Sequence, residues 1–131
     1  MNRTLQGAIG ASAAFSLFIA FALTAEISGA AFQKRSASAA RRAKKADELF
    51  KQNCARCHGA DGSGDTPLGQ RYHAPDFTDP DWWKKMNNPG KRKLAKIVSR
   101  GKEDMPAFGK KLKKSDINLL VDQVRSFRPA K

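Results

Sequence analysis

Two cysteines and a histidine stand close together near the middle of the chain. Cys54, Cys57 and His58 form the pattern C-x-x-C-H, which is the attachment signature of a c-type haem. Thiols at this spacing lie on one face of a helical turn, where each can add to a haem vinyl group. The imidazole that follows is then held under the iron as its proximal ligand. The motif predicts one covalently bound haem c, with these residues binding the cofactor and His58 binding its iron.

Three other kinds of site use a C-x-x-C pair. A thioredoxin-like redox pair follows a strand, whereas residues 46–53 form a charged, helix-like stretch without a β-branched residue. A structural zinc site needs four ligands, but the sequence has no third cysteine and only one further histidine, His73. A disulfide between such close residues would close a strained loop and leave His58 unexplained. The pattern therefore favours haem attachment.

A haem iron bound by one histidine has a second axial position, and a methionine sulfur there is typical of electron carriers. The chain has three methionines, of which Met1 is the start. Met105 precedes Pro106, which biases Met105 towards extended backbone and suits a ligand held by a loop. Met86 lies beside an expected helix end and is interpreted as core filler. Met105 is therefore predicted as the distal iron ligand, with His73 as its rival.

From residue 46 to about residue 127 the chain resembles the class I c-type cytochromes, which are small mono-haem electron carriers. Residues 49–59 are similar to the family's first helix and haem site, and residues 105–108 to its distal-ligand loop. The stretch around Pro67 resembles the loop in which a proline carbonyl accepts a hydrogen bond from the proximal imidazole. The resemblance implies that Pro67 orients the imidazole. One departure is Gln123, where family members often carry an aromatic residue on the last helix.

The sequence predicts an all-α fold, a small cytochrome c-like bundle of four to five short helices wrapped around one haem. No internal repeat or strand-like alternation is present. Residues 59–80 are rich in Gly, Asp and Pro and are expected to form a loop around the haem. Ser115 is expected to cap the last helix. The expected helices run from the low forties to about 53, from about 81 to 88, from 91 to 100, and from 115 to 127.

Apolar periodicity also predicts which side chains are buried. The last helix carries a row of apolar residues that should pack on the first helix, at Leu49 and Phe50. Adjacent Trp82 and Trp83 cannot both face inward, and one is a candidate for donating its indole N–H to a propionate. The expected haem wall consists of Leu68, Phe77, Leu94, Ile97 and Phe108.

Residues 1–30 look like a targeting segment. An apolar, uncharged run at 4–25 is followed by small residues, which fits a signal peptide cleaved after Ala30. The competing interpretation is an uncleaved anchor, because the run is long enough to span a bilayer. Residues 31–45 form a basic linker that suits either a disordered tail or contact with anionic lipid. Its alanines could also let the first helix begin early. Residues 46–131 form the haem domain. The expected location is periplasmic or exported, with membrane tethering as the alternative.

The net charge is +13 in 131 residues. The positive electrostatic field of so basic a chain favours encounters with acidic partners. Basic residues cluster at 91–93 and 110–114. No nucleic-acid-binding motif accompanies the charge, and export removes that target. The expected partners are therefore redox donor and acceptor proteins with acidic docking surfaces, and the expected state is a monomer.

These observations predict a periplasmic electron-transfer protein, not an enzyme, which cycles a His/Met-ligated haem between its ferrous and ferric states. Three alternatives stay open. The chain could be the cytochrome subunit docked to a dehydrogenase or oxidase, a haem sensor or enzyme if Met105 is labile, or a membrane-tethered carrier.

Overall fold

The computed structural model describes residues 12–130. The chain divides into two compact units, residues 1–39 and 40–131. Helix α1, Ser12–Asn53, passes through this boundary and ends where the sequence predicts. Its expected start in the low forties is wrong, because the backbone is helical from Ser12 onward. Alanine and other helix formers dominate residues 31–53, which contain neither glycine nor proline to stop the helix.

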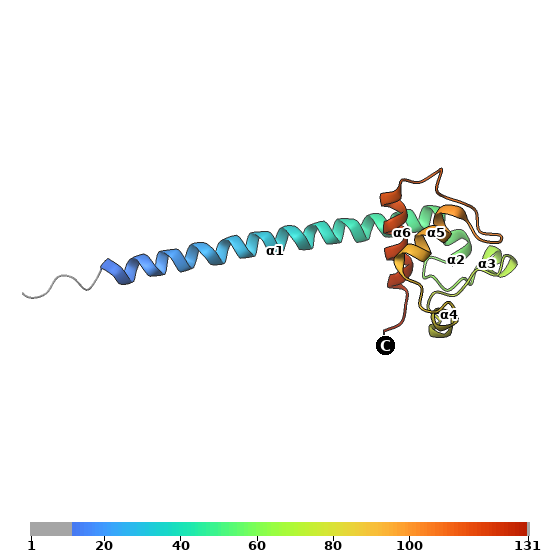
Figure 1. Cartoon of the computed structure of the whole chain (residues 1–131), viewed down its shortest axis with the longest axis horizontal. Helices are drawn as coiled ribbons and strands as arrows, with labels where there is room; N and C mark the ends of the chain where they lie inside the picture. The colour runs from blue at the N-terminus through green and yellow to red at the C-terminus, as the bar shows by residue number, and fades with distance from the viewer. Residues whose placement is uncertain (1–11, 131) are drawn as a thin grey trace, which may run out of the picture. The chain divides into compact units, whose positions relative to one another are not determined.

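The second unit is all-α, which confirms the predicted fold class. Besides the end of α1 it contains five helices, so residues 12–130 hold six rather than four to five. Figure 1 shows these helices gathered around one region, with α5 and α6 beside the end of α1. They are α2, Ala55–His58; α3, Pro67–Arg71; α4, Pro80–Lys85; α5, Lys91–Arg100; and α6, Lys114–Ser126.

Three local features differ from the sequence prediction. Helix α4 ends at Lys85 rather than at about residue 88. Helix α3 lies inside the expected loop, where the Thr66 side chain accepts a hydrogen bond from the Gly69 N–H and Pro67 stands in the first turn. A capping threonine followed by proline is a recognised helix start. Helix α6 begins one residue before Ser115, after Lys113, so Ser115 is not its N-cap.

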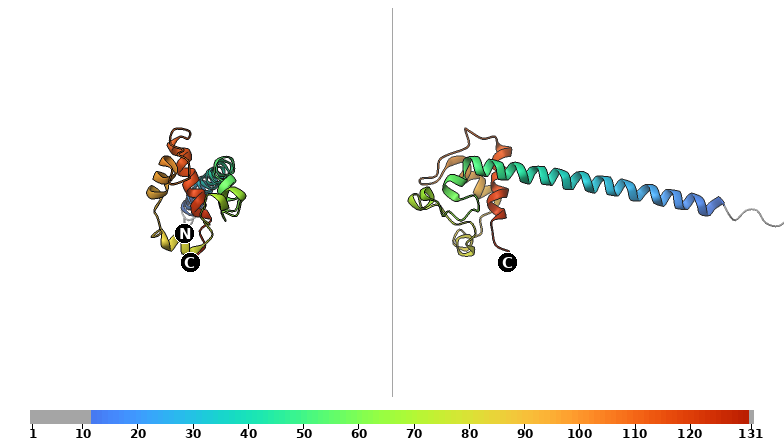
Figure 2. Two further views of the ribbon diagram at one scale, coloured as in Figure 1. Left: turned by 90° about the vertical axis from the view of Figure 1, so that its right-hand side faces the viewer. Right: turned by 180° about the vertical axis from the view of Figure 1, so that it is seen from behind.

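The core of the second unit forms where α6 crosses the end of α1 (Figure 2). The aromatic rings of Phe50 and Phe127 meet there with centroids 5.1 Å apart, and Phe50 is fully buried. This confirms the predicted packing of the last helix on the first. The buried face of α6 contains the predicted residues Ile117, Leu120, Val121 and Val124.

Ion pairs reinforce the same crossing. Lys45 on α1 donates to the Asp116 carboxylate at 2.7 Å, and Arg42 lies 3.9 Å from Asp122. Lys91 at the start of α5 also donates to Asp122. The acidic side chains of α6 are therefore engaged by bases of α1 and α5, which helps to fix these helices against one another.

The targeting segment is described in part. Residues 1–11 lie outside the described residues, and residues 12–30 are helical. Residues 31–45, the expected basic linker, are also helical, and their side chains are exposed. Among residues 12–130, none of the helices has the length and apolar character required to cross a membrane.

Candidate haem site

The C-x-x-C-H motif forms a helical turn of its own. Helix α1 ends at Asn53, and the Cys54 carbonyl then accepts hydrogen bonds from the N–H groups of Cys57, at 3.1 Å, and His58, at 3.0 Å. Gly59 ends the turn with φ +73°, a conformation that glycine adopts without strain. This turn brings both thiols and the imidazole to one cavity.

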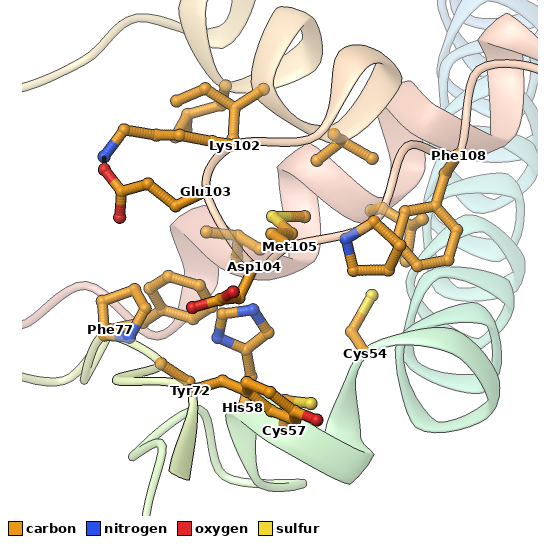
Figure 3. A pocket seen from close by; sticks show the side chains of 18 of the residues that line it. Cys54, Cys57, His58, Tyr72, Phe77, Lys102, Glu103, Asp104, Met105 and Phe108 are labelled. Atoms are coloured by element: carbon orange, nitrogen blue, oxygen red, sulfur yellow. Dashed lines mark ion pairs between the residues drawn. The ribbon is translucent and has the colours of Figure 1, made fainter. Parts of the chain in front are cut away.

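The cavity has a volume of about 210 Å³ and is lined mainly by apolar side chains. Figure 3 shows Met105 on the opposite side of it from Cys57 and His58. Four of the five expected wall residues line it, and Leu68 does not, because its helix α3 lies outside the lining. The four that line it are Phe77, Leu94, Ile97 and Phe108.

Among the polar and charged residues that the structure describes, His58 is the one that is buried, with 8% of its surface exposed. Its ring stacks on Phe77, with centroids 4.7 Å apart. Burial lowers the pKa of His58, and a backbone interaction with Pro75 opposes this in part. The Nδ1 atom is buried without a hydrogen-bond partner among the described residues. Burial thus favours the neutral imidazole, the form that can bind a metal.

The position of Pro67 does not support its predicted role of orienting the imidazole. Pro67 is exposed in the first turn of α3 and does not line the cavity. Pro75 lines it, and the Pro75 backbone is the one that acts on the His58 ring. The contact is not a formed hydrogen bond, since Nδ1 has no partner within bonding geometry. Pro75 is therefore the better candidate for orienting the imidazole.

Sequence reasoning missed Pro75, although a local signal was present. Asp76 follows it, and its carboxylate accepts hydrogen bonds from the Thr78 N–H at 2.7 Å and hydroxyl at 2.6 Å. This Asx-type turn is a known loop-fixing device. The Phe77 N–H donates to the Gly62 carbonyl at 2.8 Å. The Pro75 segment is therefore held against the start of the loop that follows the motif.

Backbone hydrogen bonds hold Met105 in place. It exchanges two backbone hydrogen bonds with Lys102, at 2.9 and 3.1 Å, across a two-residue turn. Beyond Pro106, the Phe108 N–H donates to the Val98 carbonyl of α5 at 3.0 Å. The loop is thus fixed on both sides of Met105, whose side chain is half-buried at the cavity.

The two rivals of Met105 also line the cavity. Met86 is half-buried there, and His73 is exposed with φ +52°. Trp83 is not available to a propionate, because its buried indole N–H donates to the Phe77 carbonyl at 2.8 Å. Two acidic residues that sequence reasoning did not assign, Glu103 and Asp104, also line the cavity.

The two thiols differ in their surroundings. Burial, with a smaller contribution from the neighbouring Cys57, raises the pKa of Cys54 to about 11. Both cysteines are free. Two free thiols, a buried neutral imidazole and a thioether around an apolar cavity match the donor set of a c-type haem, so the residues present fit that group.

The chain matches known cytochromes in three comparisons. Residues 41–122 match the family described as cytochrome c oxidase, cbb3-type, subunit III. The chain is 33% identical over 108 residues to the cbb3-type cytochrome c oxidase subunit FixP of Azorhizobium caulinodans, covering 78% of this chain and 34% of that protein. It is 31% identical over 94 residues to subunit CcoP of Azospirillum brasilense, covering 71% and 30%. The chain thus spans about a third of the length of these curated relatives.

A solved structure supports the same assignment. The KustC0563 c-type cytochrome superposes with a TM-score of 0.56 at 32% identity, covering 63% of this chain and 96% of that one. The haem motif, the helical fold and the family match agree. The chain belongs to the cbb3-type cytochrome c oxidase subunit III family and is a small class I c-type cytochrome, whose cofactor is covalently bound haem c.

Proposed function

We propose that this protein is an electron carrier whose haem iron is ligated by His58 and Met105 and attached through Cys54 and Cys57. One observation carries the proposal: an apolar cavity has the buried His58 on one side and the loop-held Met105 on the other. The bound haem supplies a one-electron couple between ferrous and ferric iron. If His58 and Met105 both bind the iron, no position on it would be open to substrate, and both oxidation states would keep the same two ligands.

Several residues of the protein would influence this redox couple, each through a different interaction. Burial keeps the His58 ring neutral, and the carbonyl of Pro75 would accept its Nδ1 proton and fix the ring's tautomer. The hydrogen bonds between Lys102 and Met105 would hold the thioether in place during electron transfer. Apolar side chains such as Phe77 and Phe108 line the cavity and would limit the access of water to the haem. A methionine sulfur bound to the iron in such surroundings would favour the ferrous state and raise the reduction potential.

Absorption spectra of the holoprotein test the ligand set. Wild-type ferric protein should show low-spin haem with the weak red band of sulfur-ligated iron. Met105→Leu should abolish this band, while Met86→Leu, which alters the other methionine of the cavity, should leave it unchanged. If Met86→Leu removes the band and Met105→Leu does not, the ligand assignment is wrong. Rapid binding of carbon monoxide by ferrous wild type would instead indicate a sensor or an enzyme.

We further propose that the haem domain acts outside the cytoplasm. The uncharged run at residues 4–25 and the small residues up to Ala30 support a cleaved targeting segment. Residues 31–45 would then begin the mature chain, ahead of the haem domain at 46–131. Mass spectrometry of the exported protein tests this division. A mature chain beginning at Ala31 supports it, and an intact chain retained with membranes supports an N-terminal anchor.

A docked oxidase subunit is a second candidate. The relatives in Azorhizobium and Azospirillum are named as subunits of cbb3-type oxidases. If this chain serves such a complex, it should co-purify with an oxidase in a manner that high salt does not disrupt. A free carrier should be released by salt, because electrostatic encounters are screened.

A further inference from the structure

A hollow that is open to solvent lies between helices α5 and α6, separate from the haem cavity. The outer face of α5 contributes Lys96 and Arg100, and the first turn of α6 contributes Lys114. The opposite face of α5 carries Leu94 and Val98, which line the haem cavity instead. The α5–α6 hollow, with a volume of about 420 Å³, therefore lies behind α5 as seen from the cavity.

The α5–α6 hollow combines uncompensated positive charge with an apolar floor. Lys96, Arg100 and Lys114 are exposed, and none of them forms an ion pair with any described residue. The nearby acids of α6, Asp116 and Asp122, are already engaged by other bases. The floor contains Ala95, Leu112 and the buried Ile117. Three like charges around one hollow repel each other unless an anionic group joins them.

We propose that the α5–α6 hollow is a docking site for an acidic segment of a partner protein. Carboxylates of such a segment would pair with Lys96, Arg100 and Lys114, and an apolar side chain between them would cover Leu112 and Ile117. The side chains of Ser99 and Asn118 also line the hollow and add hydrogen-bonding groups. A flat bilayer surface matches this shape less well, because lipid headgroups would reach the rim and leave the apolar floor uncovered.

The site would hold a partner close to the Met105 loop without covering the haem cavity. Gly109 lines the α5–α6 hollow, and its N–H donates to the Ser99 carbonyl of α5 at 3.0 Å. A Cβ at Gly109 would lie 2.8 Å from the same carbonyl oxygen, so glycine permits this close approach. The loop that carries Met105 thus forms one wall of the hollow. A partner docked there leaves the cavity side of the loop free for a redox protein.

Peptide binding to the ferrous holoprotein tests the proposal. The probe is a synthetic peptide, Glu-Glu-Leu-Glu-Glu with blocked ends, and its matched control carries Gln in place of Glu. Binding of the acidic peptide should shift the amide NMR signals of Ala95, Ser99 and Gly109. The double variant Lys96→Ala/Lys114→Ala should weaken it at least about fivefold, as expected for the loss of two exposed ion pairs.

The control variant Lys44→Ala/Lys85→Ala removes the same charge from exposed positions outside the hollow and should leave the affinity within about twofold. Unchanged haem spectra establish that both variants fold. The proposal is overturned if the peptide does not bind, if both double variants weaken it equally, or if the Gln peptide binds as well. It is also overturned if only vesicles containing phosphatidylglycerol shift these amides, since the site would then recognise lipid.

Discussion

The imidazole of His58 lies nearly parallel to the ring of Phe77, with the planes inclined by 19° and the centroids 4.7 Å apart. The backbone of Phe77 is held on both sides. Its N–H donates to the Gly62 carbonyl, and its carbonyl accepts from the Trp83 indole, each at 2.8 Å. The loop after the motif and helix α4 therefore both contribute to fixing the ring beside His58.

Phe77→Ala should destabilise the holoprotein by about 3 kcal/mol, because it removes a buried aromatic ring and leaves a cavity beside His58. Chemical denaturation followed by haem absorbance measures the change. Phe32→Ala is the matched control, since Phe32 is 73% exposed and its loss should change stability by less than about 0.5 kcal/mol. Equal effects of the two variants would contradict a supporting role for Phe77.

Trp83→Phe should cost about 2 kcal/mol, because it leaves the Phe77 carbonyl without its donor and removes part of a buried ring. Trp82→Phe offers a direct comparison. Trp82 is half-buried, and its indole N–H donates no hydrogen bond to any described residue. Trp82→Phe should therefore lower the free energy of unfolding distinctly less than Trp83→Phe. Thermal unfolding of both variants measures the difference, and a larger loss for Trp82→Phe would refute the role given to the indole hydrogen bond.

The sequence predicts the parts of this fold that depend on local patterns. Helix α5 runs from Lys91 to Arg100 as expected, because its apolar spacing and the following Gly101 define it locally. The buried face of α6 follows from apolar periodicity in the same way. The C-x-x-C-H motif indicates the cofactor because its spacing is tied to one chemistry.

Which of Pro67 and Pro75 lies near the His58 imidazole depends on the path of the loop in space, and no local sequence pattern determines that path. Both prolines lie in the Gly-rich stretch after the motif. Backbone hydrogen bonds between separate parts of the loop, such as Phe77 N–H to the Gly62 carbonyl at 2.8 Å, determine which of them lies near the imidazole. The early start of α1 was left open by the sequence for another reason. A basic, alanine-rich segment suits both a helix and a disordered tail, and composition alone does not separate them.

Gly69→Ala should destabilise the protein by about 2 kcal/mol or force the loop to shift. A Cβ at this position would collide with the backbone oxygens of Gly64 and Cys57, which cannot move aside as a flexible side chain would. Gly90→Ala is the control, because nothing lies within 4 Å of its Cβ position. Equilibrium unfolding should show little change for Gly90→Ala. If the two variants are equally stable, α3 does not pack tightly on the motif.

Asp104→Asn should raise the reduction potential of the haem. Asp104 lines the cavity next to Met105, and Figure 3 shows its side chain directed into it. A carboxylate there stabilises ferric iron more than ferrous iron, because the ferric form carries one more positive charge. Two charges roughly 10 Å apart in a medium close to water interact by about 20 mV, which sets the order of magnitude of the expected shift. Redox titration at constant pH and salt measures the shift.

The matching variant is Asp65→Asn, which removes the same charge from an exposed position outside the cavity lining. Its potential should stay close to that of wild type, because solvent and ions screen an exposed charge outside the cavity. Raising the salt concentration should reduce the shift of Asp104→Asn, because its side chain is exposed and ions screen its charge. An equal rise in both variants would show that net charge, rather than the position of Asp104, sets the potential, and a fall in Asp104→Asn would exclude the electrostatic explanation.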